Sequence, residues 1–175
     1  MSLNPMKQID DVIDLTRQYH NLLQRNKDDN ITAFTWDGNV LNGTSINGVF
    51  NYLQDGLGST TRVMDRQGRT QEVKSYTEFG QEINQIQKSV QPFGYTGYQK
   101  DSVSKTYFAQ NREYRAETGC FSNEDRTAGF IENPFSMNRY TYCFNMPLIL
   151  VDLDGAWPKW VETAILMMPT AIEPV

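Results

Sequence analysis

Residues 60–76 have the sequence TTRVMDRQGRTQEVKSY, and this stretch indicates the fold class. Two short segments with β-branched residues, 60–64 and 69–76, flank the tetrapeptide Asp65-Arg66-Gln67-Gly68. Such a tetrapeptide is typical of a tight hairpin turn in which the glycine takes the left-handed conformation. The stretch therefore predicts two antiparallel strands joined by a turn.

Similar turn signals recur along the chain, about every 8–12 residues, which is the spacing expected of short strands. They are Asp37-Gly38, Asn42-Gly43, Asn47-Gly48, Asp55-Gly56, Gly58, Gly68, Gly80, Gly94 and Gly97. The segments between them carry aromatic or β-branched residues, as in Val49-Phe50-Asn51-Tyr52. The pattern predicts a mainly β fold of short antiparallel hairpins.

Two segments carry helix signals. Asn133 can cap a helix, Pro134 suits its first position, and Asn145 can end it in the left-handed conformation. These residues predict one short helix near residues 134–143. The apolar spacing of residues 6–25 fits an additional N-terminal helix, but it also fits a strand, so both alternatives stay open.

The composition limits the class of protein. The 175 residues form one domain or a piece of a larger one. Hydrophobic residues make up a lean 39%, but nine tyrosines, nine phenylalanines and three tryptophans offer enough ring surface for a packed core. The formal charge of −5 disfavours nucleic-acid backbones and anionic membranes as partners.

Several kinds of site and segment are not expected. The longest apolar run, residues 164–168, is far below the roughly 20 residues of a membrane span, and no signal peptide opens the chain. A single histidine, His20, leaves no His pair for catalysis. Cys120 and Cys143 have no CxxC spacing, so we expect no metal at either; two free thiols are favoured and a disulfide is the alternative. No cofactor is expected.

The motifs of the chain resemble those of the rearrangement-hotspot (RHS), or YD-repeat, proteins. Residues 52–62 (YLQDGLGSTTR) are similar to the signature YxxDxLGSxR of this family. Residues 76–80 (YTEFG), 92–98 (PFGYTGY), 107–121 (YFAQNREYRAETGCF) and 151–155 (VDLDG) resemble further motifs of the RHS repeat-associated core, in the family's order. The resemblance covers residues 31–157.

The resemblance implies an architecture and a function. YD repeats form hairpins that wind into a hollow β-shell around a C-terminal toxin, and the associated core closes this shell. The implied division is an N-terminal segment (1–30), the core (31–157) and a tail (158–175) that begins the variable passenger. The implied partners are the rest of the shell and the toxin, in a secreted or cell-surface effector. Exposed strand edges also predict self-association of the isolated piece.

In several family members the core is an aspartyl autoprotease, which leaves the enzyme status of this chain open. By resemblance the catalytic pair is Asp125 and Asp152, with Asp154 as an alternative carboxylate, and the scissile bond joins Ala156 to Trp157. Such a protease needs two carboxylates that share a proton. The structural alternative is that these aspartates bind backbone N–H groups in turns.

Two features weigh against cleavage. Arg112 and Arg139 could pair with the carboxylates, which would hold them ionised and oppose a shared proton. Leu153 stands where the family has proline, and this should loosen the turn that presents the bond. The alternative function is a binding module for glycan or a partner protein that uses the aromatic side chains, although core packing also explains these rings. The mass of the purified chain distinguishes cleavage from binding.

Overall fold

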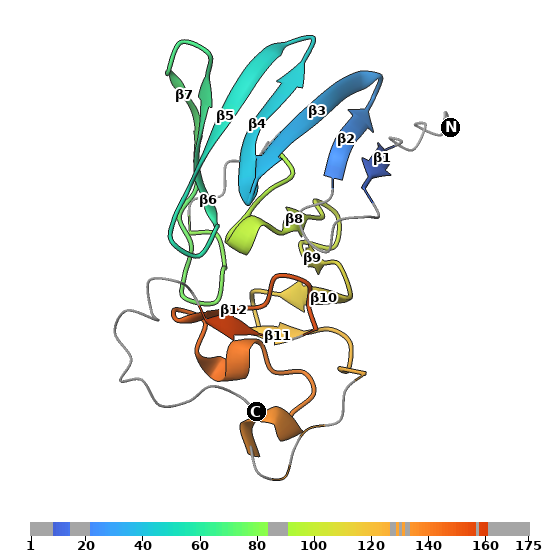
Figure 1. Cartoon of the computed structure of the whole chain (residues 1–175), viewed down its shortest axis with the longest axis vertical. Helices are drawn as coiled ribbons and strands as arrows, with labels where there is room; N and C mark the ends of the chain where they lie inside the picture. Colours follow the sequence, from blue (N-terminus) through green and yellow to red (C-terminus); the bar gives the residue numbers. More distant parts are fainter. Residues whose placement is uncertain are drawn as a thin grey trace, which may run out of the picture.

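The computed structural model describes residues 9–14, 22–83, 91–126, 129, 131, 134–156 and 158–160. These residues form a large antiparallel sheet in the upper half of the molecule and a smaller set of short strands and turns in the lower half (Figure 1). The mainly β prediction is confirmed.

The large sheet is a meander of seven strands that pair in chain order. The strands are β1 (Ile9–Ile13), β2 (Leu22–Lys27), β3 (Asn30–Asp37), β4 (Asn39–Ser45), β5 (Gly48–Gln54), β6 (Thr60–Asp65) and β7 (Thr70–Val73). The predicted turn glycines Gly38, Gly48 and Gly68 all have positive φ, of 70°, 124° and 79°. The hairpin predicted at residues 60–76 is therefore present as β6 and β7.

The lower half contains shorter elements. They are η1 (Tyr95–Gly97), β8 (Gln99–Lys100), β9 (Tyr107–Ala109), β10 (Arg112–Arg115), β11 (Cys120–Phe121), η2 (Pro134–Met137), η3 (Cys143–Asn145), β12 (Leu150–Val151) and β13 (Lys159–Trp160), where η marks a 3₁₀ helix. Strands β8 to β11 form one sheet in the order β11-β10-β9-β8, and β12 pairs with β13.

The helix expected near residues 134–143 is confined to the single 3₁₀ turn η2. Strand pairing takes the backbone groups that a longer helix would need, because the Tyr140 carbonyl accepts the Phe121 N–H at 2.9 Å and Thr141 bridges Cys120. The side chain of Asn138 also accepts the Tyr140 N–H at 3.1 Å. Asn145 is left-handed as predicted, with φ 61°.

The N-terminal helix is replaced by strands in the described part of residues 6–25. β1 pairs with β2, and β2 pairs with β3 through the turn at Asp28 and Asp29. The division at residue 30 stays a prediction, although β1 and β2 belong to the same sheet as β3.

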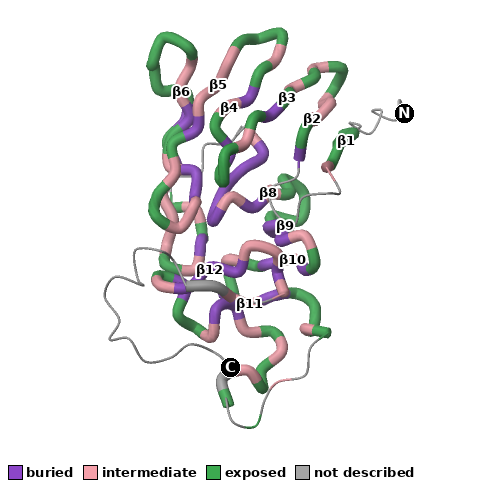
Figure 2. Tube along the Cα trace, viewed as in Figure 1, coloured by how far each residue is buried: buried purple, intermediate pink, exposed green. Residues whose placement is uncertain are grey.

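Phe93 is the centre of the upper core. Figure 2 shows buried stretches both in the strands of the large sheet and among the short strands below it. The rings of Phe34 and Trp36 each meet it edge-on at 5.0 Å between centroids, and Tyr52 meets it at 5.7 Å. Phe93 comes from the segment that follows the sheet, so it joins the sheet to the lower half.

A cluster of buried rings forms the lower core. Its members are Tyr95, Tyr98, Tyr107, Tyr114, Phe121 and Tyr142, and each is at most 3% exposed. Three of the hydroxyls donate to three consecutive carbonyls: Tyr95 to Glu78 and Tyr114 to Phe79 at 2.7 Å, and Tyr107 to Gly80 at 3.2 Å. The tyrosines therefore fix residues 78–80 while their rings fill the core. Most of the aromatic motif residues pack inside the molecule and offer no stacking surface.

Candidate active site

Arg112 organises the candidate site from the first position of β10. Its side chain is 7% exposed, and the guanidinium carbon lies 3.6 Å from the centroid of the Phe121 ring. A guanidinium so placed is attracted by the face of the ring. The stacking leaves its N–H groups to bind oxygens at its edge.

One guanidinium brings the two predicted catalytic residues together. Nη1 of Arg112 lies 3.1 Å from Oδ2 of Asp125, and Nη2 lies 3.3 Å from Oδ2 of Asp152. The two aspartates are 27 positions apart in the chain (152 − 125), so folding closes this distance. The sequence analysis named Arg112 as a partner of either carboxylate, and the structure shows it as the partner of both.

Arg139, the other predicted partner, contacts the backbone of Asp125 instead of its carboxylate. The Asp125 N–H donates to the Arg139 carbonyl at 2.9 Å, and the Arg139 guanidinium donates back to the Asp125 carbonyl. A second N–H of Arg139 binds the carboxylate of Glu124. Arg139 therefore fixes the segment that carries Asp125.

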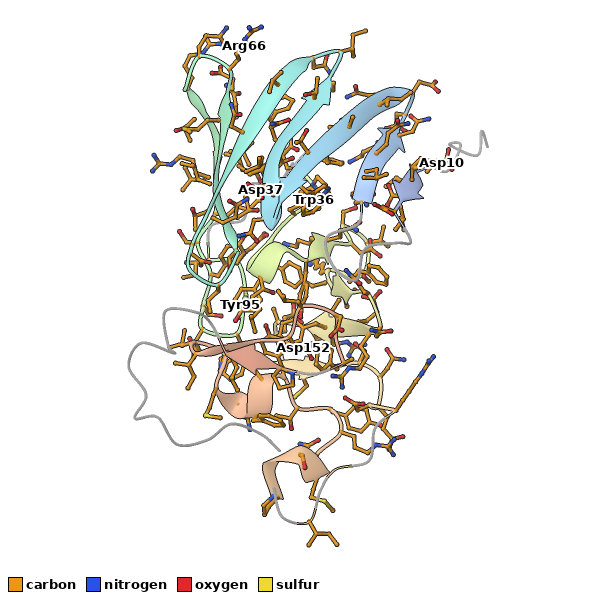
Figure 3. The ribbon with its side chains drawn as sticks, viewed as in Figure 1. Asp10, Trp36, Asp37, Arg66, Tyr95 and Asp152 are labelled. Carbon is orange, nitrogen blue, oxygen red and sulfur yellow. The ribbon has the colours of Figure 1, made fainter. Side chains whose placement is uncertain are left out.

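Asp152 follows β12 and is 1% exposed (Figure 3, below Tyr95). Its Oδ1 accepts the Ala156 N–H at 3.1 Å, and Oδ1 of Asp154 accepts the same N–H at 3.1 Å. Both carboxylates are thus bound to the residue that the sequence analysis placed before the scissile bond. Trp157, on the other side of that bond, lies outside the described residues.

Burial raises the pKa of Asp152 from 3.8 to about 6. Arg112 opposes this shift because it favours the carboxylate, whereas the neighbouring carboxyl of Asp154 adds to it. Asp152 can therefore take up a proton at mildly acidic pH, although its Oδ2 lies beside the Arg112 guanidinium.

The turn that carries Ala156 is packed against the tip of the β9–β10 hairpin. Gly155 has φ 69°, and a Cβ there would lie 2.5 Å from the Ala109 carbonyl oxygen. Its own carbonyl accepts Nε of Arg112. The carbonyl of Asp154 accepts both the N–H and the side-chain amide of Asn111, at 3.0 and 2.9 Å.

Sequence reasoning did not single out Asn111. Its partner Asp154 lies 43 positions away in the chain, so no local pattern reveals the contact. The only local signal is that Asn111 directly precedes Arg112.

A small cavity of about 30 Å³ adjoins Asp125 and Ala156. Its lining includes Arg112, Asp125, Arg139, Ala156 and Pro158. A cavity of this size has room for at least one water molecule, and the polar lining supplies partners for it. A wider groove of about 570 Å³ is also lined by Arg112, Asp125 and Ala156, and it opens to solvent.

The rest of the described chain offers no metal centre. No group of three or more histidine, cysteine, aspartate or glutamate side chains within the described ranges could hold a metal ion. Cys120 and Cys143 are free thiols. None of the helices seen in these ranges is long and apolar enough to cross a membrane.

The chain is similar in sequence to small parts of two tRNA nucleases, whereas no family model matches it. It is 26% identical over 149 residues to the tRNA3(Ser)-specific nuclease WapA of Bacillus spizizenii, which covers 82% of this chain and 6% of that protein. It is 35% identical over 72 residues to the tRNA(Glu)-specific nuclease WapA of Bacillus subtilis subsp. natto, or 41% of this chain and 3% of that protein. The chain therefore spans a few per cent of the length of the curated relatives it matches.

Solved toxin structures share the fold. The crystal structure of TcdB2-TccC3-Cdc42 matches 78% of this chain and 7% of its own, with a TM-score of 0.64 and 18% identity. The Tc holotoxin pore of Photorhabdus luminescens, with a mutated TccC3, matches 89% of this chain and 7% of its own, with a TM-score of 0.65 and 16% identity. At 16–18% identity, these likenesses show the fold of the chain.

Proposed function

We propose that the chain is the closing core of an RHS-type toxin and that it cuts its own backbone between Ala156 and Trp157. The supporting observation is the guanidinium of Arg112, which holds Asp125 and Asp152 together beside Ala156. The proposal makes the remaining shell and a C-terminal toxin the partners of the chain, within a secreted or cell-surface effector.

The reaction follows from the positions of the two carboxyl groups. A water molecule in the small cavity attacks the Ala156 carbonyl carbon, and Asp125, which lines that cavity, takes the proton of the water. The C–N bond then breaks, and Asp152 gives its proton to the Trp157 nitrogen. The products are a carboxyl group on Ala156 and an amine on Trp157. Asp154 is the alternative carboxylate, because its Oδ1 also accepts the Ala156 N–H.

Protonation of Asp152 is the condition for this reaction. Arg112 contacts both carboxylates and favours the charged form of Asp152, which opposes a proton shared between the two. Burial outweighs this contact at Asp152, whose pKa of about 6 allows a proton to be held in mildly acidic solution. Cleavage should therefore become faster as the pH falls through about 6.

The test is intact mass spectrometry of the full chain during incubation at pH 5 to 8. We expect two products that separate after Ala156, and no cleavage in Asp125→Asn or Asp152→Asn. Asp101→Asn is the matched control, because Asp101 also accepts a backbone N–H in a turn, that of Val103 at 2.8 Å, away from the site. A parent chain that stays intact throughout, or cleavage that continues in Asp152→Asn, contradicts the proposal.

A binding module is the second candidate, and it receives less support. Of the aromatic motif residues, Phe108 and Tyr140 are exposed, at 39% and 45%, whereas most of the other rings lie in the two cores. A chain that stays intact and binds a partner or glycan would favour this function.

A further inference from the structure

The tip of the β9–β10 hairpin contacts the turn that carries Ala156. Ala109 and Arg112 pair across the hairpin, so the loop between them is Gln110 and Asn111. Gln110 has φ 59°, a conformation that costs a non-glycine residue free energy. A two-residue hairpin loop requires a positive φ at its first position, and this loop also rests on the turn at Asp154.

Asn111 binds that turn twice. Its backbone N–H and its side-chain amide both donate to the Asp154 carbonyl, at 3.0 and 2.9 Å. The backbone bond needs no particular residue type at this position. The side-chain bond needs an amide of this length, so it is a property of the asparagine.

The turn itself contains little that limits its own backbone. Leu153 and Asp154 are ordinary residues, and Gly155 is the most permissive residue of all. The turn nevertheless has to keep the Ala156 N–H on the carboxylates of Asp152 and Asp154. The bonds to Asp152 and Asp154 hold the turn from within, and two contacts from the β9–β10 hairpin add to them: Arg112 on the Gly155 carbonyl and Asn111 on the Asp154 carbonyl.

We infer that Asn111 is a positioning residue, whose side-chain amide holds residues 152–155 so that Ala156 stays bound to Asp152. Its consequence for cleavage rests on the proposed function, whereas its effect on the turn does not. Asn111 thus supplies from a neighbouring hairpin the restraint that a proline at position 153 would supply within the turn. Leu153→Pro therefore tests whether a restraint within the turn can replace the bond from Asn111.

Amide hydrogen exchange of Ala156, followed by nuclear magnetic resonance, tests the inference without any cleavage. All chains carry Asp125→Asn so that they stay intact. Asn111→Ala should speed Ala156 exchange about three- to tenfold, the loss expected for one net hydrogen bond. Adding Leu153→Pro should return the exchange rate to that of the Asn111 chain.

The matched control is Gln54→Ala. Gln54 also donates a side-chain amide to a backbone carbonyl, that of Val40 at 2.6 Å, but in the large sheet. Its loss should leave Ala156 exchange unchanged. Unchanged exchange in Asn111→Ala overturns the inference, and so does faster exchange that Leu153→Pro fails to reverse, since that result indicates a general loss of stability.

The cleavage rate of the same substitutions with Asp125 restored separates the two proposals. If cleavage slows in Asn111→Ala and recovers with Leu153→Pro, the positioning role extends to the reaction. If exchange behaves as expected but the parent chain never cuts, the positioning role stands and the proposed autocleavage fails.

Discussion

The two halves of the molecule are both antiparallel, but they are held together differently. In the large sheet each strand pairs with its neighbours in the chain, and many apolar side chains stay exposed, among them Ile9, Val12, Ile31 and Leu41 at 45–51%. In the lower half the strands are two to four residues long, and buried tyrosines hold them. The strands of the sheet thus pair locally around the ring of Phe93, whereas the candidate site depends throughout on contacts between distant segments.

The largest expected effect lies at the centre of the lower core. Tyr114 is fully buried, and its ring centroid lies 4.4 Å from that of Tyr142. Tyr114→Ala should lower the free energy of unfolding by about 3–5 kcal/mol in urea titrations, because it removes a ring and leaves a cavity. Tyr140→Ala is the control: its side chain is 45% exposed, and the change should stay within about 0.5 kcal/mol. Equal losses for both would remove the distinction between core and surface rings.

Two glycines with nearly the same φ, one in each half, sharpen the comparison. Gly38 in the large sheet has φ 70° and open space around it, whereas Gly155 has φ 69° and would bring an added Cβ to 2.5 Å from the Ala109 carbonyl oxygen. Gly38→Ala should cost about 1–2 kcal/mol for its left-handed conformation alone. Gly155→Ala should cost about 2–5 kcal/mol, since overpacking adds to this. Thermal unfolding measures both, and equal costs would mean that the lower turn yields as readily as the hairpin.

The pH dependence of stability reports on Asp152. Its folded pKa of about 6 exceeds the ordinary value of 3.8, so the folded chain holds the proton more tightly than the unfolded chain. This contribution is fully present below pH 3.8 and is lost as the pH rises through about 6, with a size of up to about 3 kcal/mol. The parent should therefore lose stability relative to Asp152→Asn between pH 4 and pH 7 in urea titrations. If the difference in unfolding free energy between the two chains stayed constant with pH, burial would not raise the pKa of Asp152.

The smallest expected effect on stability lies at the edge of the large sheet. All five residues of β1 are exposed, and an exposed strand edge can pair with another chain. Val12→Lys should change the free energy of unfolding by less than about 0.5 kcal/mol and reduce self-association in sedimentation velocity. Ile46→Lys adds the same charge at a turn and should leave association unchanged, because Ile46 belongs to no edge strand. Loss of association in both variants would point to net charge instead of the edge.

The same contrast explains which features the sequence could predict. The hairpins of the large sheet were predicted because a turn signal such as Asp65-Arg66-Gln67-Gly68 lies between the two strands that it joins. The helix near residues 134–143 was overestimated because its capping signals are local, whereas the pairing of Tyr140 with Phe121 that limits it is not.

The candidate site shows the same limit. Asp125 and Asp152 were named from their motifs, but no local pattern places them on one guanidinium. Asn111 was missed because its partner lies in a different turn, and only the folded chain brings the two together.

The three tyrosine hydroxyls that bind residues 78–80 give the chain an optical reporter of its own folding. Burial raises the pKa of Tyr95, Tyr107 and Tyr114, so these phenols stay neutral in alkaline solution that would ionise a free tyrosine. Phenolate absorbs ultraviolet light at longer wavelengths than phenol, and leaving the core would let these rings ionise at a lower pH. In an alkaline titration, their colour change and the collapse of the lower half should therefore be a single event.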